Sequence, residues 1–184
     1  MVRAKYYTGI GSRKIPQDIK DLMEEIGFQL AIKGYILRSG ASPGADTAFE
    51  LGCIRGEGEM EIFLPWNGFG KRKGDDYIIS DLLSNYDYAE AIARKYHPGF
   101  SPLTPEAKKL IIRDGYQVLG SDLATRSSFI ICWTPDGCIG DSQRSQKTGG
   151  TGQAISIATA IKIKVFNLKL LPHRKNIIEW IKKI

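Results

Sequence analysis

The chain has 184 residues, of which 42% are hydrophobic and 25% charged, values that fit one globular α/β domain and leave little room for a second. The formal net charge of +6 favours anionic partners but falls short of the composition of a protein that coats nucleic acid.

Cysteine and histidine are sparse in this sequence. The 3 cysteines form neither a disulfide framework nor a Cys-x-x-Cys pair, and with only 2 histidines they predict no metal site. No apolar stretch approaches the length of a membrane span, and the N-terminus lacks the apolar core of a signal peptide. We therefore expect a cytoplasmic protein that does not contact membranes.

Strands and helices alternate in the first third of the chain. The apolar patterns predict strands over residues 4–10, 35–39 and 62–64, and helices over residues 16–34 and 45–52. Because strands separated by helices pair in parallel through right-handed crossovers, this order predicts a parallel sheet.

The pattern changes after residue 65. Residues 66–104 are predicted as an insertion over the edge of the sheet, with a helix around 78–96. The elements expected beyond it are helices over 105–119, 153–161 and 172–184 and strands over 128–133 and 164–167. The whole chain, residues 1–184, is thus expected to form a single Rossmann-like α/β domain, with a mostly parallel open sheet and helices on both faces.

Three loops follow predicted strands at the carboxyl edge of the sheet, where open α/β sheets bind ligands. They comprise residues 9–13, 39–46 and 134–152. The third loop contains Gly149, Gly150, Thr151 and Gly152 directly before a helical pattern. Glycines at a helix start let backbone N–H groups approach an anion, and the helix dipole favours negative charge there. The sequence therefore predicts a phosphate site at this loop.

The first loop does not complete a dinucleotide fingerprint. Lys14 stands where a third glycine is needed, and the second strand ends in Arg38-Ser39 instead of an acid. The sequence also lacks a Walker A motif. We therefore predict no NAD site and no bound cofactor. Ser12 and Arg13 either grip a phosphate or form a tight turn with a surface arginine.

Two carboxylates on the predicted second helix are candidates for chemistry. Asp46 either accepts a hydrogen bond from a ribose hydroxyl or stabilises its own helix start, and Glu50 lies one turn further along the same face. Trp66 either stacks on a base or, more commonly for such a residue, closes the core. The complete predicted ligand-binding set is Gly9, Gly11, Ser12, Arg13, Ser39, Gly40, Ala41, Gly44, Asp46, Glu50, Trp66, Thr134, Asp136, Gly149, Gly150, Thr151, Gly152 and Gln153.

Three stretches together resemble the SLOG superfamily, which includes DNA-processing protein A (DprA) and the LONELY GUY (LOG) phosphoribohydrolases. They are residues 8–13, 39–48 and 149–152. The first two are similar to DprA motifs in order and spacing, above all to those of short stand-alone DprA-like proteins of bacteriophages. The resemblance implies a Rossmann-like fold, a nucleotide or nucleic-acid ligand at the glycine loops, and a homo-oligomer.

The sequence departs from LOG enzymes at one informative position. These enzymes carry a glutamate shortly after the glycine loop, and the matching position here is Ser156. Other SLOG domains sense nucleotide signals, ADP-ribose derivatives among them, inside defence effectors that carry an output domain. The leading hypothesis is therefore a nucleotide-binding protein, a phage anti-defence sponge that sequesters a host immune signal of the ADP-ribose or cyclic nucleotide type. The alternatives are a nucleotide N-glycosidase or phosphoribohydrolase that uses Glu50 or Asp46, and a DprA-like mediator that binds single-stranded DNA.

Overall fold

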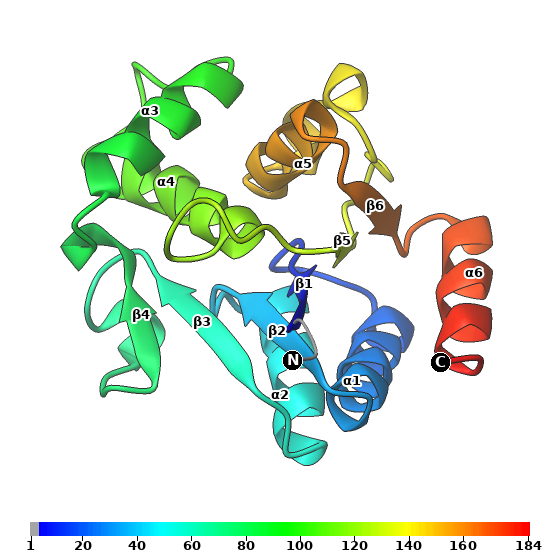
Figure 1. The fold of residues 1–184 in the computed structure, drawn as a ribbon. Coiled ribbons are helices and arrows are strands. Elements are labelled where there is room, and N and C mark those ends of the chain that lie inside the picture. Colours follow the sequence, from blue (N-terminus) through cyan, green and yellow to red (C-terminus); the bar gives the residue numbers. More distant parts are fainter. Residues whose placement is uncertain (1–3) are drawn as a thin grey trace.

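The first strand, β1 (Lys5–Gly9), lies inside a parallel sheet of six strands. The computed structural model describes residues 4–184. The strand order is β4-β3-β2-β1-β5-β6, and every neighbouring pair is parallel (Figure 1). The other strands are β2 (Tyr35–Ser39), β3 (Met60–Leu64), β4 (Tyr77–Ile79), β5 (Phe129–Cys132) and β6 (Lys164–Asn167). The predicted Rossmann-like fold with an open parallel sheet is confirmed.

The direction in which strands are added reverses once, beside β1. From β1 the chain adds β2, β3 and β4 towards one edge, and it then returns to add β5 and β6 on the other side of β1. The loops that leave β1 and β5 therefore run to opposite sides and open a crevice at their carboxyl ends. Ligands of open α/β sheets bind at such a switch point.

Helices cover both faces of the sheet, as predicted. The helices α1 (Gln17–Ile32), α2 (Ala45–Arg55) and α6 (Leu171–Ile181) pack on one face, and α3 (Tyr86–Tyr96), α4 (Pro105–Leu119) and α5 (Thr151–Ala160) lie on the other (Figure 1). In β5, Phe129 and Ile131 point into the first layer while Ile130 and Cys132 point into the second. Burial on both faces explains why this strand is continuously apolar.

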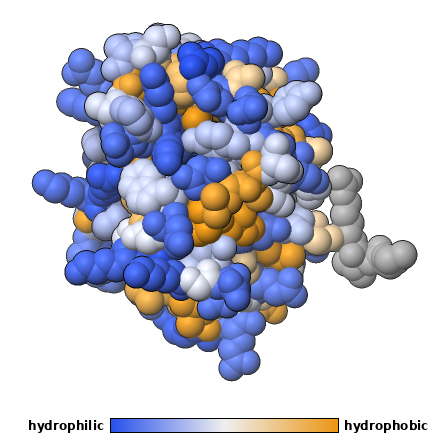
Figure 2. Space-filling model, turned by 90° about the vertical axis from the view of Figure 1, so that its left-hand side faces the viewer, coloured by the Kyte–Doolittle hydropathy of each residue, from blue (hydrophilic) through white to orange (hydrophobic). Residues whose placement is uncertain are grey.

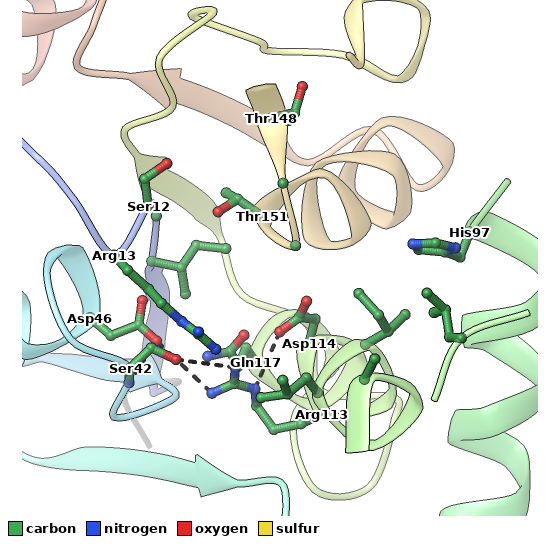
Figure 3. A pocket seen from close by; sticks show the side chains of 18 residues that line it. Ser12, Arg13, Ser42, Asp46, His97, Arg113, Asp114, Gln117, Thr148 and Thr151 are labelled. Carbon is green, nitrogen blue, oxygen red and sulfur yellow. Dashed lines mark hydrogen bonds and ion pairs between the residues drawn. The ribbon is translucent and has the colours of Figure 1, made fainter. Parts of the chain in front are cut away.

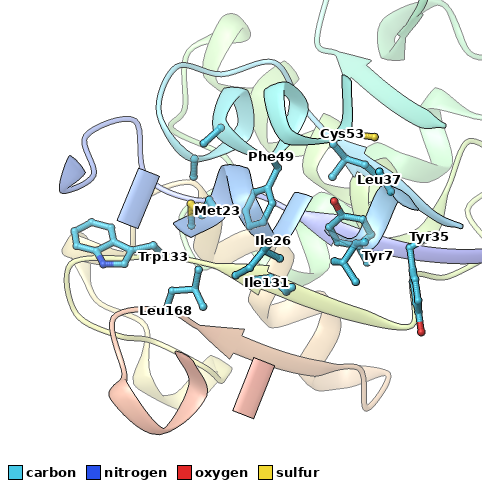
Figure 4. Close-up of a cluster of buried hydrophobic side chains, with 14 of the residues drawn as sticks. Tyr7, Met23, Ile26, Tyr35, Leu37, Phe49, Cys53, Ile131, Trp133 and Leu168 are labelled. Carbon is cyan, nitrogen blue, oxygen red and sulfur yellow. The ribbon is translucent and has the colours of Figure 1, made fainter. Parts of the chain in front are cut away.

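The larger core lies between the sheet and the α1–α2 pair (Figure 4). Tyr7 of β1 is fully buried there, and its ring meets Phe49 edge-on with centroids 6.3 Å apart and stacks on Phe129 at 5.9 Å. The two helices approach so closely that a Cβ at Gly27 would lie 2.6 Å from the carbonyl oxygen of Phe49. This close packing holds α2 directly against α1.

The segment 66–104 departs most from the sequence-based expectation. Residues 77–79 form the edge strand β4, although the predicted helix over 78–96 included the last two of them, and α3 begins only at Tyr86. The run Tyr77-Ile78-Ile79 consists of β-forming residue types, and pairing with β3 outweighs the weak helical periodicity of the region. Figure 2 shows the molecule from the side on which β4 and α3 lie, with an apolar patch surrounded by polar residues.

A smaller correction concerns the start of one helix. Helix α5 begins at Thr151, two residues before the predicted start. The N-cap of α2 is Gly44, and Cys138 is buried with its Sγ 3.3 Å from the carbonyl oxygen of Gly140. None of the helices in the described chain is long and apolar enough to cross a membrane, and no cluster of metal-ligating side chains occurs within residues 4–184.

Candidate functional site

A pocket of about 500 Å³ opens at the switch point between β1 and β5 (Figure 3). It is lined by the loop after β1, the start of α2, the inner side of α4 and the loop before α5. The lining residues are Ile10, Gly11, Ser12, Arg13, Ser42, Asp46, His97, Leu103, Ala107, Leu110, Ile111, Arg113, Asp114, Gln117, Thr148, Gly149, Gly150 and Thr151. Its position is the one expected for the ligand site of an open parallel sheet.

The loop after β1 is anchored on both of its neighbours. The N–H of Ser12 donates to the carbonyl oxygen of Trp133 at 3.0 Å, and the N–H of Ala45 donates to the carbonyl oxygen of Ser12 at 3.3 Å. A Cβ at Gly11 would lie 2.8 Å from the carbonyl oxygen of Trp133, and a Cβ at Gly44, whose φ is +91°, would overlap the backbone of Arg13. These two glycines allow the loops after β1, β2 and β5 to pack against one another, and this packing forms one wall of the pocket.

The glycine loop before α5 is held by Asp136. Its Oδ2 accepts hydrogen bonds from the hydroxyls of Ser145, at 2.6 Å, and of Thr148. Burial alone raises the pKa of Asp136, but the hydroxyls of Ser145 and Thr148 outweigh it and lower the pKa to about 2. Helix α5 then starts with no side chain of residues 4–184 capping it. The N–H groups of Gly152 and Gln153 donate to the carbonyl oxygens of Gly149 and Gly150, so the N–H groups of Gly150 and Thr151, together with the helix dipole, favour an anion at this loop.

Helix α4 contributes a buried arginine that neither the motifs nor the periodicity predicted. The Nη1 of Arg113 donates to the carbonyl oxygen of Gly40 at 2.5 Å, and its Nε lies 3.2 Å from Oδ1 of Asp114. The same Nη1 lies 4.0 Å from Oδ2 of Asp46. One guanidinium thus faces two carboxylates at the floor of the pocket, and all three side chains are buried.

The pKa values of both carboxyl groups are raised towards neutrality. Burial raises the pKa of Asp114 to about 7; Arg113 opposes this rise and the neighbouring Asp46 adds to it. Burial also raises the pKa of Asp46 to about 6, against the opposing effects of Arg113 and of the N–H groups of Ser42, Gly11 and Gly40. A pair of interacting acids that titrates near neutrality can give and take protons, and such pairs concentrate at functional sites.

Gln117 ties the acid pair to the end of β2. In the amide orientation that satisfies both neighbours, its nitrogen donates to Asp114 Oδ1 at 3.1 Å and its oxygen accepts from the N–H of Gly40 at 2.8 Å. Asp114 Oδ1 is therefore engaged within the protein by Arg113 and Gln117. The second oxygen of this carboxyl group remains directed to the pocket.

The far end of the pocket is apolar. It is formed by Leu103, Ala107, Leu110 and Ile111, which come from the start of α4 and the segment before it. His97 lies beside them (Figure 3), and its Nδ1 accepts a hydrogen bond from the N–H of Gly99 at 3.2 Å. Burial and the nearby Arg144 lower the pKa of His97, so its imidazole is neutral at pH 7 and carries its proton on Nε2.

Seven of the predicted ligand contacts line this pocket: Gly11, Ser12, Arg13, Asp46, Gly149, Gly150 and Thr151. Others form the layer behind it. Ser39 donates its hydroxyl to the carbonyl oxygen of Gly9 at 2.6 Å, and Gly40 leaves space for the guanidinium of Arg113. Gly44 packs on Arg13, and Ala41 has a φ of +57° in the same turn.

Two predicted contacts at the start of α5 point into the protein. A Cβ at Gly152 would lie 2.5 Å from Nε of Arg144, whose Nη1 donates to Ser156 Oγ at 2.8 Å. Gln153 is buried and its Nε2 donates to the carbonyl oxygen of Ala93 at 3.4 Å. Ser156, at the position of the LOG glutamate, therefore belongs to a network with Arg144 and Asp141.

Four further predicted contacts lie outside the lining. The buried Glu50 forms an ion pair with Arg72. Trp66 packs edge-on against Phe69, with ring centroids 5.2 Å apart. Thr134 is buried and its hydroxyl oxygen accepts from Asn167 Nδ2 at 2.8 Å, while Asp136 holds the glycine loop as described above. These contacts position other parts of the protein.

The sequence reasoning missed Arg113, Asp114, Gln117 and His97. A signal for the first three existed, because they stand within the run Ile111–Leu119, where every residue is buried. Charged side chains are almost never fully buried unless they are paired. Polar residues on a helix that is buried all round therefore indicate an internal network. The sequence did not show which residues of the sheet take part in it.

No protein-family model matches the sequence, and no curated protein matches it either. Solved structures do resemble it. The Moco carrier protein of Chlamydomonas reinhardtii has a TM-score of 0.52 at 16% identity, covering 98% of this chain and 86% of the carrier. DprA from Streptococcus pneumoniae has a TM-score of 0.51 at 15% identity, covering 96% of this chain. The fold resembles those of the Moco carrier protein and of DprA.

This likeness confirms the predicted resemblance at the level of the fold. The present chain spans 56% of the length of the pneumococcal DprA. At 15–16% identity the comparison carries information on the fold alone. The function has to be argued from the pocket.

Proposed function

We propose that this protein binds a nucleotide-type ligand in the pocket at the switch point, with a phosphate at the start of α5. The observation that carries the proposal is the position of an uncapped helix start opposite Arg13, within the part of the chain that the structure describes. A helix N-terminus together with a guanidinium is a strong combination for a phosphate. The volume of about 500 Å³ lies within the usual range of small-molecule sites.

The arrangement of polar and apolar residues in the pocket also suits the sugar and the base of a nucleotide. The acids Asp46 and Asp114 are suited to sugar hydroxyls and phosphate oxygens at the polar end. The apolar end, with Leu103 and Leu110, offers an apolar surface for a base, and the neutral His97 supplies a donor beside it. An amphipathic ligand fits this arrangement better than a free sugar phosphate does.

In the cell, we propose, the ligand is held intact, so that the protein acts as a sponge. A bacteriophage protein of this kind would sequester a host immune nucleotide of the ADP-ribose or cyclic nucleotide type in the host cytoplasm, as a homo-oligomer. Two points support retention over turnover. Ser156 replaces the LOG glutamate and is bonded to Arg144, and the structural neighbour from Chlamydomonas is by its name a carrier protein.

Ligand retention can be tested directly. The purified protein is incubated with AMP, ADP-ribose and a cyclic dinucleotide, binding is measured by calorimetry, and the bound fraction is released by heat and analysed by mass spectrometry. We expect at least one of these compounds to bind and to be recovered intact. Recovery of free base or ribose phosphate would show hydrolysis.

Hydrolysis is the second candidate, and the acid pair favours it. A nucleotide N-glycosidase needs an acid near neutrality to assist departure of the base, and Asp114 and Asp46 have pKa values of about 7 and about 6. Glu50, the other predicted candidate, lies outside the pocket lining and pairs with Arg72. If products appear, Asp114→Asn and Asp46→Asn should each abolish turnover while Glu50→Gln should not.

Single-stranded DNA is a third possible ligand, given the DprA-like fold and the net charge of +6. The affinity for single-stranded DNA falls as the salt concentration rises, and the fall becomes steeper with each phosphate that the protein neutralises. Titration of an oligothymidine at two salt concentrations distinguishes it from the nucleotide site. Tight mononucleotide binding without oligonucleotide binding would exclude the DprA-like role.

A further inference from the structure

Asp114 has one oxygen in the protein network and one in the pocket. Its Oδ1 faces Arg113 Nε at 3.2 Å and the amide of Gln117 at 3.1 Å. Its Oδ2 is the atom nearest to the Cβ position of Gly150, at 4.0 Å. This second oxygen therefore stands beside the start of α5, where Figure 3 shows the side chain directed into the open pocket.

That placement creates a conflict with a bound phosphate. A phosphate held by the first N–H groups of α5 brings its oxygens next to Asp114 Oδ2. An ionised carboxylate is only an acceptor and repels a phosphate oxygen at hydrogen-bond distance, whereas a protonated carboxyl donates to it. Asp114 therefore repels the phosphate when it is ionised and binds it when it is protonated.

The surrounding charges do not remove the conflict. Arg113 on the same helix is shared between Asp114 and Asp46 of α2. Arg144, from the loop before α5, is engaged by Tyr96 and Ser156. Arg13, from the loop after β1, lines the same pocket, and the imidazole of His97 is neutral. Arg113 is the cation paired with Asp114, and it is shared with Asp46; Arg144 acts on Asp114 from a greater distance and lowers its pKa, but burial and Asp46 still hold that pKa at about 7.

We infer that Asp114 binds the phosphate-bearing ligand as a neutral carboxylic acid, donating a hydrogen bond from Oδ2 to a phosphate oxygen, so that one proton enters the site with the ligand. The proton comes from solvent, and Asp46 remains the carboxylate partner of Arg113. The inference rests on the proposed function. The pKa of about 7 in the free protein means that the proton is acquired at little cost near neutrality.

Calorimetric titration with AMP and with ADP-ribose between pH 7.5 and 9.5 tests it. The phosphate of AMP, with a second pKa of about 6, is fully ionised in this range, so it contributes no slope. We expect the affinity to fall about tenfold for each pH unit above 7.5, as uptake of a single proton requires. Titrations at pH 8.5 in buffers of different ionisation enthalpy should show uptake of about one proton per ligand.

Variants at the two acids separate the inference from a general effect of charge. Asp114→Asn keeps a neutral donor, and we expect it to bind without pH dependence and at least about tenfold more tightly than the wild type at pH 8.5. Asp114→Ala should also lose the pH dependence but bind more weakly than Asp114→Asn, because it lacks the donor. Asp46→Asn should keep the slope.

Several results would overturn the inference. A flat pH profile in the wild type would show that no proton is taken up with the ligand. A slope that is lost in Asp46→Asn and kept in Asp114→Asn would show that the proton is taken up by Asp46. Weaker binding by Asp114→Asn than by the wild type at pH 8.5 would show that the carboxylate accepts from a ligand hydroxyl. Failure of AMP, ADP-ribose and a cyclic dinucleotide to bind even at pH 6.5 would overturn the proposed function as well, whereas binding with a flat profile would overturn the inference alone.

Discussion

Gly40 and Arg113 are in direct contact at the floor of the pocket. The Nη1 of Arg113 donates to the carbonyl oxygen of Gly40 at 2.5 Å, and a Cβ at Gly40 would overlap that same nitrogen. The glycine at the end of β2 therefore leaves room for a buried guanidinium. This stretch was predicted to bind a ligand, and its carbonyl group binds a cation of the protein itself.

Replacing Gly40 by alanine should displace the guanidinium and leave two buried acids without their partner. We expect a loss of about 2–4 kcal/mol in the free energy of unfolding, measured by urea denaturation, because uncompensated buried charges are costly. Gly115→Ala on α4 is the matched control, since within residues 4–184 nothing lies near its Cβ position. It should be neutral or stabilising by about 1 kcal/mol. Equal losses in both variants would contradict this reading.

Asp114→Asn should stabilise the protein at high pH. A carboxyl whose pKa is raised to about 7 binds more protons in the folded than in the unfolded state, so folding stability falls as the pH rises from about 4 to 7. Asparagine removes that loss. At pH 8 we expect a gain of about 1–3 kcal/mol in the free energy of unfolding, and at pH 4 no difference. Denaturation curves at both pH values check this, and a destabilised variant at pH 8 would contradict it.

Asp136→Ala should loosen the glycine loop without unfolding the protein. It removes the acceptor of the Ser145 and Thr148 hydroxyls, at an expected cost of about 1 kcal/mol in stability and about tenfold in nucleotide affinity. Asp122→Ala is the control, because Asp122 holds a separate turn through the N–H groups of Ala124 and Thr125, at 2.9 and 2.8 Å. It should cost similar stability and leave affinity unchanged. A loss of affinity in both would point to a global effect.

Glu50→Gln should affect stability and not the ligand. Glu50 is buried and paired with Arg72, so its loss leaves a partly buried guanidinium uncompensated and should cost about 1–3 kcal/mol in thermal or chemical unfolding. Glu24→Gln, which breaks an exposed pair with Arg55 at 3.3 Å, should cost less than about 1 kcal/mol. If Glu50→Gln remains folded but loses nucleotide binding, Glu50 belongs to the site after all.

Gly150→Val should abolish nucleotide binding in a folded protein. Gly150 has ordinary helical angles, with φ −59° and ψ −32°, so the backbone accepts a side chain. The nearest atom to its Cβ position is Asp114 Oδ2 at 4.0 Å, and a valine would therefore occupy the proposed phosphate site.

Arg13→Ala should weaken binding by about 1.5–3 kcal/mol. Calorimetry and circular dichroism together check both, and retained affinity in Gly150→Val would remove this loop from the site.

Much of the fold is readable from local patterns. The predicted ranges 35–39, 105–119 and 164–167 coincide with β2, α4 and β6. Each is a segment whose periodicity is clear and whose ends are marked by glycine, proline or a polar turn. Strand β4 was missed because three residues carry too little periodicity, and pairing with β3 decides its structure.

The sequence by itself determined the parallel sheet and the meeting of the loops after β1, β2 and β5. Loops that leave parallel strands share one edge, so Ser12, Asp46 and Gly150 had to lie near each other. Only the tertiary structure decided what closes the site, because the crossover after β4 lays α4 across these loops and buries Arg113 and Asp114 against β2. Burial and the shared guanidinium set the proton affinity of the two acids, and neither can be read from the spacing of residues along the chain.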